Sequence, residues 1–300
     1  MPAANHANTG ASAGGPRTQK GAHDPFATKY YGNYASEGRT SHFSRSFVRP
    51  IRKEFMKRRG FTLVELMTVL AILAILYAIA VPAFIATKAA AQSMVSVNGL
   101  KELGECTNMY IADSDDTAPL AMYNGQNGML VAWFGAQTGP AQFDPQGGLL
   151  YPYEKGHPSM DPTAHFQPWI GDGSGYGYNW GYIGSDFNYY SVYFGFPNCQ
   201  NPANMSQLTG PATTILFATS SYFSAPWLPG GTGTYYDFGF VDPPHLWNGN
   251  PDVDFRHQGL KTVDVRGKTV TSTGHANVVR CDGSAKPMKW GQITDVMFTR

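Results

Sequence analysis

The sequence predicts an α+β fold, in which a long N-terminal α-helix packs on a loop-rich C-terminal head with an antiparallel β-sheet. Three observations support this prediction. Residues 61–91 form a nearly uncharged apolar run, the apolar residues after it recur at helical spacing to about Tyr110, and the C-terminal part contains two segments typical of β-hairpins. Abundant Gly, Pro and aromatic residues argue against a helical bundle.

Composition and charge indicate a folded protein and exclude some classes of function. Of the 300 residues, 42% are apolar and 14% are charged, so most of the chain is expected to fold around a sizeable core. Residues 1–60 carry 11 Lys and Arg against 3 Asp and Glu, which leaves 11 against 18 for residues 61–300. The acidic C-terminal part argues against nucleic acid as a partner, because binding of phosphates needs concentrated Lys and Arg.

The apolar run has the length of a membrane-spanning helix. The 22 residues from Phe61 to Pro82 would extend about 33 Å as a helix, which matches a hydrocarbon core of about 30 Å. Glu65 is the single charge of this run before Lys88. A basic cluster precedes the run: Lys57, Arg58 and Arg59. By the positive-inside rule that end stays in the cytoplasm and the C-terminal head lies outside it.

Beyond the membrane the helix is expected to continue as a stem to Ile111. The segment from about 113 to 250 is rich in Gly, Pro, Tyr, Trp and Asn and is expected to consist mainly of long loops, with Thr213–Thr219 as its clearest strand. Two hairpins are predicted near the C-terminus. One surrounds residues 266–268, between KTVDV and TVTST, and the other has Asp282-Gly283 as a two-residue turn between HANVVRC and SAKPMKW.

The start of the apolar run carries the functional signal, in the order Lys57-Arg58-Arg59-Gly60-Phe61-Thr62-Leu63-Val64-Glu65-Leu66. A carboxylate inside an apolar span is costly, since a charged residue at the centre of a membrane helix costs about 2.5–3.5 kcal/mol. Cleavage between Gly60 and Phe61 would create an α-amine that can pair with Glu65, on the same chain or on the next one in an assembly. The alternative is an interfacial carboxylate that reaches water at the helix start.

This stretch closely resembles the processing site of type IV prepilins and type II secretion pseudopilins. The resemblance implies that a prepilin peptidase cuts after Gly60 and methylates the amine of Phe61, so that residues 1–60 are a leader removed on processing. Met56 opens a leader of ordinary length and is a candidate start. Pro82 stands where many members of the family kink the helix; alternatively, it marks the point where the helix leaves the membrane.

The resemblance further implies a pilin-like subunit without enzymatic activity of its own. Residues 61–111 would form its helix, which spans the cytoplasmic membrane once to about residue 85, and residues 112–300 its extracytoplasmic head. The expected partners are the prepilin peptidase, copies of itself or other pilin-like subunits, and an inner-membrane assembly platform. Glu65 would set the register of a fibre by pairing with Phe61 of a neighbour. A secretion pseudopilus, a twitching pilus and a DNA-uptake pilus all remain open.

The head is similar at scattered points to large-headed pseudopilin-like proteins of planctomycete-type bacteria. The shared points are a Tyr, an Asp cluster and a Pro after the stem, a Tyr-Gly-Tyr-Asn segment, and an Arg-His followed by Asp-Gly: Tyr110, Asp113, Asp115, Asp116, Pro119, Tyr176–Asn179, Arg256, His257, Asp282 and Gly283. In that family nine residues separate the His from the Asp-Gly, whereas 24 separate them here. The KTVDV/TVTST hairpin is a candidate insertion, and His275 is another candidate for the aligned histidine.

Two groups of residues are candidates for a metal site. Asp113, Asp115 and Asp116 resemble a fragment of a calcium loop, because hard cations take several carboxylate oxygens, but the Gly and the bidentate Glu of an EF-hand are missing. A solvated turn that ends the stem is therefore favoured, and no cofactor is expected. The last quarter also gathers potential ligands of a hydrolytic metal site without any HExxH pattern: His245, His257, His275 and Asp282.

The aromatic residues supply a second hypothesis of function. Between Tyr151 and Gln200 there are 14 aromatics, several of them closely spaced among glycines: Trp169, Tyr176, Tyr178, Trp180 and Tyr182. A core of a loop-rich domain is the favoured interpretation. Stacking on sugar rings is the alternative, which would make the chain a membrane-anchored surface protein whose head recognises polysaccharide.

The cysteines leave the redox state open. Cys106, Cys199 and Cys281 are isolated and odd in number, so one disulfide with one free thiol and three free thiols are both compatible with the sequence.

Overall fold

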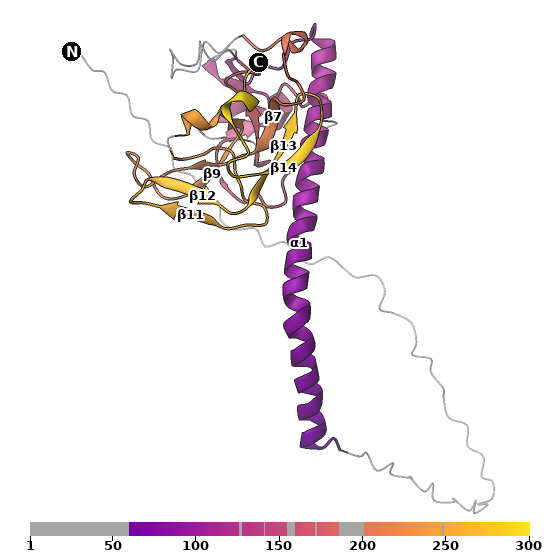
Figure 1. The fold of residues 1–300 in the computed structure, drawn as a ribbon. Helices are drawn as coiled ribbons and strands as arrows, with labels where there is room; N and C mark the ends of the chain where they lie inside the picture. Colours follow the sequence, from indigo (N-terminus) through magenta and orange to yellow (C-terminus); the bar gives the residue numbers. More distant parts are fainter. Residues whose placement is uncertain are drawn as a thin grey trace, which may run out of the picture. The chain divides into compact units, whose positions relative to one another are not determined.

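The described residues contain one long α-helix, α1 (Leu63–Asp113), whose second half packs along the head and whose first half extends beyond it (Figure 1). The computed structural model describes residues 60–125, 128–140, 142–154, 160–171, 173–185, 201–247 and 249–300. Residues 61–300 form one compact unit. The α+β prediction, with one long N-terminal helix followed by a β-rich head, is confirmed.

The two halves of α1 meet different surroundings. Between Phe61 and Ile85, 16 large apolar side chains are exposed, and Figure 1 shows this half extending away from the head. In the second half, one face is buried against the head at spacings of mostly three or four residues, as expected of an amphipathic helix. The buried residues of this face are Ser93, Ser96, Val97, Gly99, Leu100, Leu103, Gly104, Cys106, Thr107 and Ile111.

A five-stranded sheet packs against the buried face of α1. Its order is β10 (Phe240–Val241), β6 (Tyr176–Asn179), β7 (Ile215–Thr219), β13 (His275–Arg280) and β14 (Ala285–Lys289). α1 contacts β7, β13 and β14. The central pairings are antiparallel as expected, but β10 lies parallel to β6, so the sheet is mixed. The strand predicted at Thr213–Thr219 is β7.

Three smaller sheets complete the described part of the head. One is a four-stranded antiparallel sheet of β1 (Met122–Asn124), β2 (Leu130–Ala132), β3 (Gly135–Gly139) and β4 (Gln142–Asp144). The second joins β5 (Gln167–Ile170), β9 (Tyr235–Phe238) and β8 (Tyr222–Phe223), and the third is the hairpin of β11 (Lys261–Asp264) and β12 (Thr269–Ser272). Short 3-10 helices connect them: η2 (Pro145–Gly147), η4 (Met205–Gln207), η5 (Pro244–Leu246) and η6 (Asp295–Met297).

The segment between 113 and 250 is loop-rich as expected, but it contains more strands than Thr213–Thr219 alone. The described residues of this segment contain nine short strands besides β7, none longer than five residues. Strands this short show no clear alternation of apolar and polar residues, and those in the core, such as β6, are buried on every residue. Hydrophobic periodicity therefore gives little signal for them.

Both predicted C-terminal hairpins are present, but one turn differs from the prediction. β11 pairs with β12 and β13 with β14, each antiparallel. In the second hairpin the N–H of Arg280 donates to the carbonyl of Ser284 at 2.9 Å, which leaves residues 281–283 as a three-residue turn. Gly283 has φ +80°, so the glycine adopts the left-handed conformation that such turns require at one position.

The aromatic residues form the main core, as the favoured interpretation predicted. Tyr176 and Tyr178 are 0% exposed and Trp180 is 5% exposed. The indole N–H of Trp133 donates to the carbonyl of Gly239 at 2.7 Å, and its ring packs edge-on against Phe217, with centroids 5.0 Å apart. Aromatic side chains here replace the aliphatic ones that the segment lacks, because they bury large apolar areas per residue.

Candidate functional site

The candidate site begins at the junction of Gly60 and Phe61, immediately before α1. Both residues are exposed, Phe61 to 87%, and a Cβ added at Gly60 would meet no atom within 4 Å. Among the described residues, nothing therefore covers the peptide bond between them. The basic residues predicted to flank it, Lys57, Arg58 and Arg59, lie outside the described residues, as does Met56.

Thr62 and Glu65 close the N-terminus of α1 as a capping box. The backbone N–H and the hydroxyl of Thr62 both donate to the Glu65 carboxylate at 2.8 Å, and the N–H of Glu65 donates to the Thr62 hydroxyl at 3.2 Å. These bonds satisfy two backbone donors that a helix start leaves without partners. The carboxylate also stands at the positive end of the helix dipole, where negative charge is stabilising.

The helix that follows is long and apolar enough to cross a membrane, and none of its most apolar window is buried inside the structure. Glu65 is the only charged residue between Phe61 and Lys88. Water does not stabilise such a surface, because each exposed apolar side chain costs about 1.5–3 kcal/mol relative to burial. This half of α1 therefore fits a helix that anchors the chain in a membrane.

Pro82 lies inside α1, and the helix continues through it without interruption. Proline has no N–H to donate, so the carbonyl of Ala78, four residues earlier, lacks its usual partner from that position. The Thr87 hydroxyl donates to the carbonyl of Ala83 at 2.8 Å, a bond of the kind that accompanies bending in helices. Whether Pro82 acts as a kink in the assembled state stays a prediction.

Residues 55–81 match the family model of the prokaryotic N-terminal methylation motif. The match covers the Gly60-Phe61 junction, the capping box and most of the apolar run, and it supports the resemblance to type IV pilins and pseudopilins. The motif belongs to structural proteins and not to enzymes, and it fits a membrane-anchored, pilin-like chain. Comparison with curated proteins and with solved structures finds no match.

The match to the methylation motif ends within the exposed, apolar half of α1. The head contains a second group of interacting polar side chains, which is centred on Asp161. Asp161 is 2% exposed and lies where α1 meets the sheet. Its Oδ2 accepts hydrogen bonds from the Ser96 hydroxyl at 2.8 Å, from Arg256 Nη2 at 3.1 Å and from His257 Nε2 at 3.0 Å. Burial opposes ionisation of Asp161, but the bond from His257 and the charge of Arg256 outweigh it and hold its pKa well below the ordinary value.

Arg256 links Asp161 to a second buried carboxylate. Its Nη1 donates to Asp254 Oδ2 at 3.0 Å, and Asp254 Oδ1 lies 2.5 Å from Lys261 Nζ. Burial opposes ionisation of Asp254, but Arg256 and Lys261 together lower its pKa. Two carboxylates and two cations therefore neutralise one another, and Nη1 and Nη2 of Arg256 also donate to the carbonyls of Ser220 and Gly175, whereas its buried Nε has no hydrogen-bond partner among the described residues. This composition is typical of a structural network, since buried ion pairs are retained where each charge is compensated.

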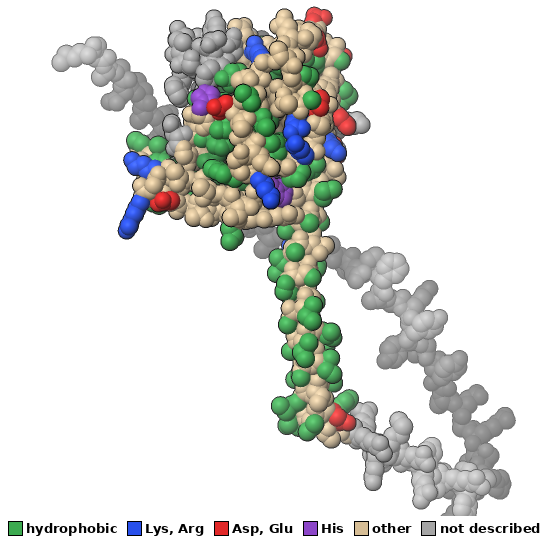
Figure 2. Space-filling model, viewed as in Figure 1, with side chains coloured by type: hydrophobic (Ala, Val, Ile, Leu, Met, Phe, Trp, Pro, Cys, Tyr) green, Lys and Arg blue, Asp and Glu red, His purple; other side chains and the backbone are tan. Residues whose placement is uncertain are grey.

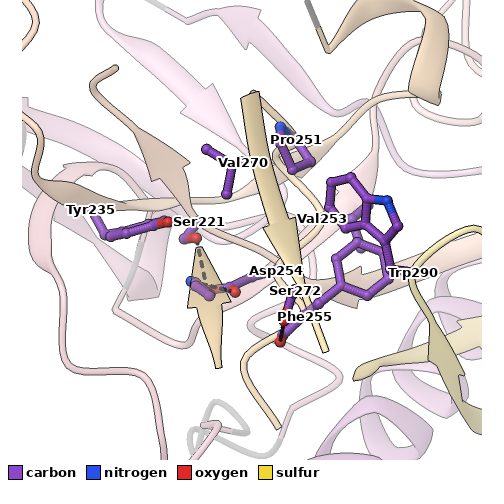
Figure 3. A pocket seen from close by; sticks show the side chains of 10 residues that line it. Ser221, Tyr235, Pro251, Val253, Asp254, Phe255, Val270, Ser272 and Trp290 are labelled. Atoms are coloured by element: carbon purple, nitrogen blue, oxygen red, sulfur yellow. Dashed lines mark hydrogen bonds and ion pairs between the residues drawn. The ribbon is translucent and has the colours of Figure 1, made fainter. Parts of the chain in front are cut away.

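A small pocket opens beside this network, between the β11–β12 hairpin and residues 251–255 (Figure 3). Figure 3 shows Ser221 bonded to Asp254, at 2.7 Å, with Tyr235 on one side and Phe255 and Trp290 on the other. Asp254 is the one carboxylate of its lining, and it is already paired with two cations. The pocket therefore presents no uncompensated charge with which to hold a ligand.

The structure separates the two parts of the predicted C-terminal motif. His257 forms an isolated antiparallel bridge with His275 at the start of β13, whereas Asp282 and Gly283 form the turn after its end. Asp282 is exposed, and its Oδ1 accepts from the backbone N–H and the hydroxyl of Ser284 at 2.9 and 2.6 Å. Arg256 and His257 are therefore parts of the buried network, and Asp282 stabilises a surface turn.

The residues that were only candidates for a metal site do not come together in the described part of the chain. Among the described residues, no three His, Cys, Asp or Glu side chains are arranged to hold a metal ion. The exposed Asp113, Asp115 and Asp116 form the turn that ends α1; the last two have φ of 51° and 61°, and the carbonyl of Asp116 accepts from the N–H of Met205 at 2.8 Å. His245 pairs with Asp295 at the surface, 3.1 Å away.

Cys106 and Cys281 are free thiols in the structure, both buried. Burial raises the pKa of Cys106 to about 11 and that of Cys281 to about 12, so neither is a reactive thiolate at neutral pH. Cys199 lies outside the described residues.

Sequence reasoning missed two features of this site. The capping box had a local signature, a Thr followed three residues later by Glu at the start of an apolar run, and could have been found from it. Asp161 had none, because its partner Arg256 is 95 residues away and nothing around either residue marks the pairing.

Proposed function

We propose that this chain is a pilin-like subunit that is anchored in the cytoplasmic membrane by α1, cleaved between Gly60 and Phe61, N-methylated at Phe61, and assembled into a type II secretion or type IV pilus-like fibre. The observation that carries the proposal is the coincidence of the methylation motif with the start of an exposed apolar helix. The cut would leave one residue, Phe61, before the Thr62 cap and would leave α1 complete.

The accessibility of the junction supports cleavage. A peptidase must approach the backbone of its substrate, and no residue of the described part of the chain lies close enough to Gly60 to prevent this. Cleavage leaves a new α-amine at Phe61, four residues from Glu65 and on the same side of the membrane. The prepilin peptidase is then the first partner, and the head lies outside the cytoplasm during the reaction.

The exposed half of α1 supports assembly. In the membrane its apolar side chains contact lipid, and in a fibre the same side chains contact the helices of neighbouring subunits, so the helix leaves lipid without meeting water. Apolar packing specifies the axial offset between subunits only loosely. Pairing of Glu65 with the Phe61 amine of a neighbour supplies the missing specificity, because a charge pair is strong at the low dielectric of a helix bundle.

The head favours a specialised role within such a fibre. Residues 112–300 are a large head for a major subunit, and their acidic balance argues against nucleic acid as their ligand. The assembly platform of the inner membrane and other pilin-like subunits are the remaining partners of the proposal. It assigns no catalytic activity to the chain.

Electron microscopy of sheared surface filaments, labelled with antibodies against the head, tests this proposal. Decorated filaments are expected from the unaltered chain. Gly60→Ala is the matched control, because it leaves the fold untouched and only hinders the peptidase, so it should give anchored, uncleaved protein without filaments. Cleaved protein that stays in the membrane while the apparatus forms normal filaments without it would contradict the proposal.

A polysaccharide-binding head remains the second candidate, and one observation favours it. Trp169 is 36% exposed, and its ring lies 4.2 Å from that of Tyr222 and 6.3 Å from that of Tyr236, centroid to centroid. Such a group of rings on one sheet can stack on sugars. Loss of glycan binding by the Trp169→Ala chain, with filaments unaffected, would support it; equal binding by both chains would exclude these rings.

A further inference from the structure

The β11–β12 hairpin projects from the head and forms a two-stranded sheet of its own. His257 and His275 bridge directly, with N–H···O distances of 3.1 and 2.9 Å, so the chain enters and leaves the hairpin at one point. β11 and β12 pair only with each other. Neither strand belongs to the five-stranded sheet, so the hairpin is not needed for the pairing of that sheet and can have a separate function.

The direction of β13 fixes which end of the head carries this hairpin. β13 starts at His275, whose Nε2 lies 2.9 Å from the Ser93 hydroxyl, and proceeds to Val279, which packs against Gly104. The 11 residues from Ser93 to Gly104 correspond to about 16 Å along the helix axis. β13 therefore runs away from the apolar half of α1, and the hairpin that precedes it lies at the end of the head nearest to that half. Figure 1 shows β11 and β12 along this edge.

One face of the hairpin is attached to the head. Val270 is buried in a cluster with Phe223 and Ala225, and Lys261 pairs with Asp254 and lies 3.8 Å from the ring centroid of Tyr235. The N–H groups of Arg266 and Gly267 donate to Asp264 Oδ1 at 3.0 Å, which orders the turn. These contacts hold the hairpin in a fixed position at the edge of the head.

The turn end of the hairpin, residues 265–268, presents an exposed face that is apolar and basic. Leu260 is 77% and Val265 55% exposed, and Arg266 and Lys268 are exposed beside Val265. No salt bridge among the described residues includes either cation. Figure 2 shows basic and acidic side chains at the free end of this lobe. The turn end thus combines aliphatic side chains with two cations and the exposed carboxylate of Asp264, while residues 61–300 as a whole carry 11 Lys and Arg against 18 Asp and Glu.

The membrane lies within reach of this face. A hydrocarbon core of about 30 Å takes up roughly 20 helical residues from Phe61, and the headgroup layer takes up a few more, to about residue 86. Ser93, which marks the near end of the head, lies five residues after Lys88, or about 7.5 Å along the helix. This gap is similar to the Debye length of about 8 Å at physiological salt, and Arg and Lys side chains shorten it further.

We propose that the exposed face at the turn of the β11–β12 hairpin rests on the anionic headgroups of the membrane that anchors α1, with Arg266 and Lys268 at the phosphates and Val265 at the headgroup layer. Charge complementarity and continuity with the membrane anchor favour lipid over a second copy of the chain as the occupant. The proposal rests on the anchoring part of the proposed function and not on fibre assembly. The contact is available only to a subunit that is still in the membrane.

Photo-crosslinking of the full chain in lipid vesicles tests this proposal. Benzoylphenylalanine replaces Val265 in one chain and Lys286 in another; Lys286 is exposed on β14, in the hairpin whose turn lies at the opposite end of the head. Vesicles consist of phosphatidylcholine alone or mixed with phosphatidylglycerol. Lipid adducts are expected at position 265 in the mixed vesicles and not at position 286. Arg266→Gln and Lys268→Gln should each lower the adduct yield about fivefold, since each basic residue near an anionic surface contributes similarly.

The possible results distinguish a failure of the lipid contact from a failure of the membrane anchor. Equal adducts at positions 265 and 286, or none at 265 in a chain that resists alkaline extraction, would overturn the lipid contact and leave the anchor intact. Adducts between position 265 and another copy of the chain would identify the hairpin as a subunit contact and overturn the lipid proposal. A chain that alkaline buffer extracts from the vesicles would overturn the membrane anchor, and with it this contact.

Discussion

Thr62 and Glu65 hydrogen-bond each other reciprocally at the start of α1, so the carboxylate of Glu65 has a partner within its own chain before any cleavage or assembly. This relationship gives Glu65 two separable roles. It caps the helix through its oxygens, and it offers a negative charge to the Phe61 amine of a neighbour. Substitutions that keep one role and remove the other distinguish between them.

Glu65→Gln should insert and be cleaved but should not assemble. Gln keeps an acceptor for the Thr62 donors, so the capping box survives, whereas the charge that pairs with Phe61 is lost. Glu65→Val removes both, with an added loss of about 1 kcal/mol at the helix start. Immunoblots of membrane and filament fractions would show cleaved protein accumulating in the membrane for both variants. Normal filament yield from Glu65→Gln would reduce Glu65 to a cap, and normal yield from Glu65→Val would refute its role in assembly.

Arg256→Leu should destabilise the head by about 3–5 kcal/mol, because it leaves Asp161 and Asp254 buried without their shared cation. Arg256→Lys should cost less but should not restore full stability, since a lysine cannot replace the fork that reaches both carboxylates. Thermal unfolding of the detergent-solubilised chain measures both variants. Lys286→Leu, at an exposed position, is the control and should change stability little. A loss for Arg256→Leu no larger than that of the control would contradict this account of the network.

Gly283→Val should destabilise the head by on the order of 1 kcal/mol or more, because φ of +80° is unfavourable for a β-branched residue. A Cβ at this position meets no atom within 4 Å, so the loss comes from the backbone alone. Gly283→Asn is the matched control, since Asn tolerates the left-handed region, and it should lose less. Equal melting temperatures for the Val and Asn variants would show that the turn does not hold this conformation in solution.

The stability of the head should fall as the pH rises toward neutral, owing to Asp242 and Asp252. Oδ2 of Asp252 accepts from the N–H of Asp242 at 2.9 Å; burial raises the pKa of Asp242 to about 7, and burial together with the charge of Asp242 raises that of Asp252 further. Between the unfolded pKa of about 4 and these values the folded state binds more protons than the unfolded state, so the free energy of unfolding decreases with pH.

Asp252→Asn tests this pH dependence, because the amide oxygen can still accept from Asp242 while the ionisable group is gone. Melting temperatures measured from about pH 5 to pH 8 should decline less steeply for the variant, which should be the more stable chain at the upper end. Parallel curves for the two chains would show that the acid pair does not titrate in this range.

The parts of the fold that were predictable have local causes. α1 follows from an apolar run and a helical period, and the β11–β12 and β13–β14 hairpins follow from turn residues between β-branched segments. The turn at Asp282-Gly283 was placed correctly but counted one residue too short, because an Asp-Gly pair suits both two- and three-residue turns. The parallel pairing of β10 with β6 was not predictable, since it joins two short strands far apart in the sequence.

The residues of the candidate site likewise differ in whether the local sequence was enough to identify them. Gly60, Phe61 and Glu65 lie within six residues of one another, so the candidate site that they form can be recognised from the sequence alone. The role of Asp161 as a buried partner of Arg256 and His257 is seen only in the structure, because these residues are 95 and 96 positions away in the sequence. His257 and Asp282, which the resemblance places in one sequence motif, lie near opposite ends of β13.

Mass spectrometry of the chain purified from membranes that contain a prepilin peptidase tests the central claim most directly. The account predicts a mature protein whose first residue is Phe61 with a methylated amine, while Gly60→Ala yields the uncleaved chain. A peptide from the mature protein that still contains the intact Gly60–Phe61 bond, with the peptidase active on other substrates in the same cells, would contradict it.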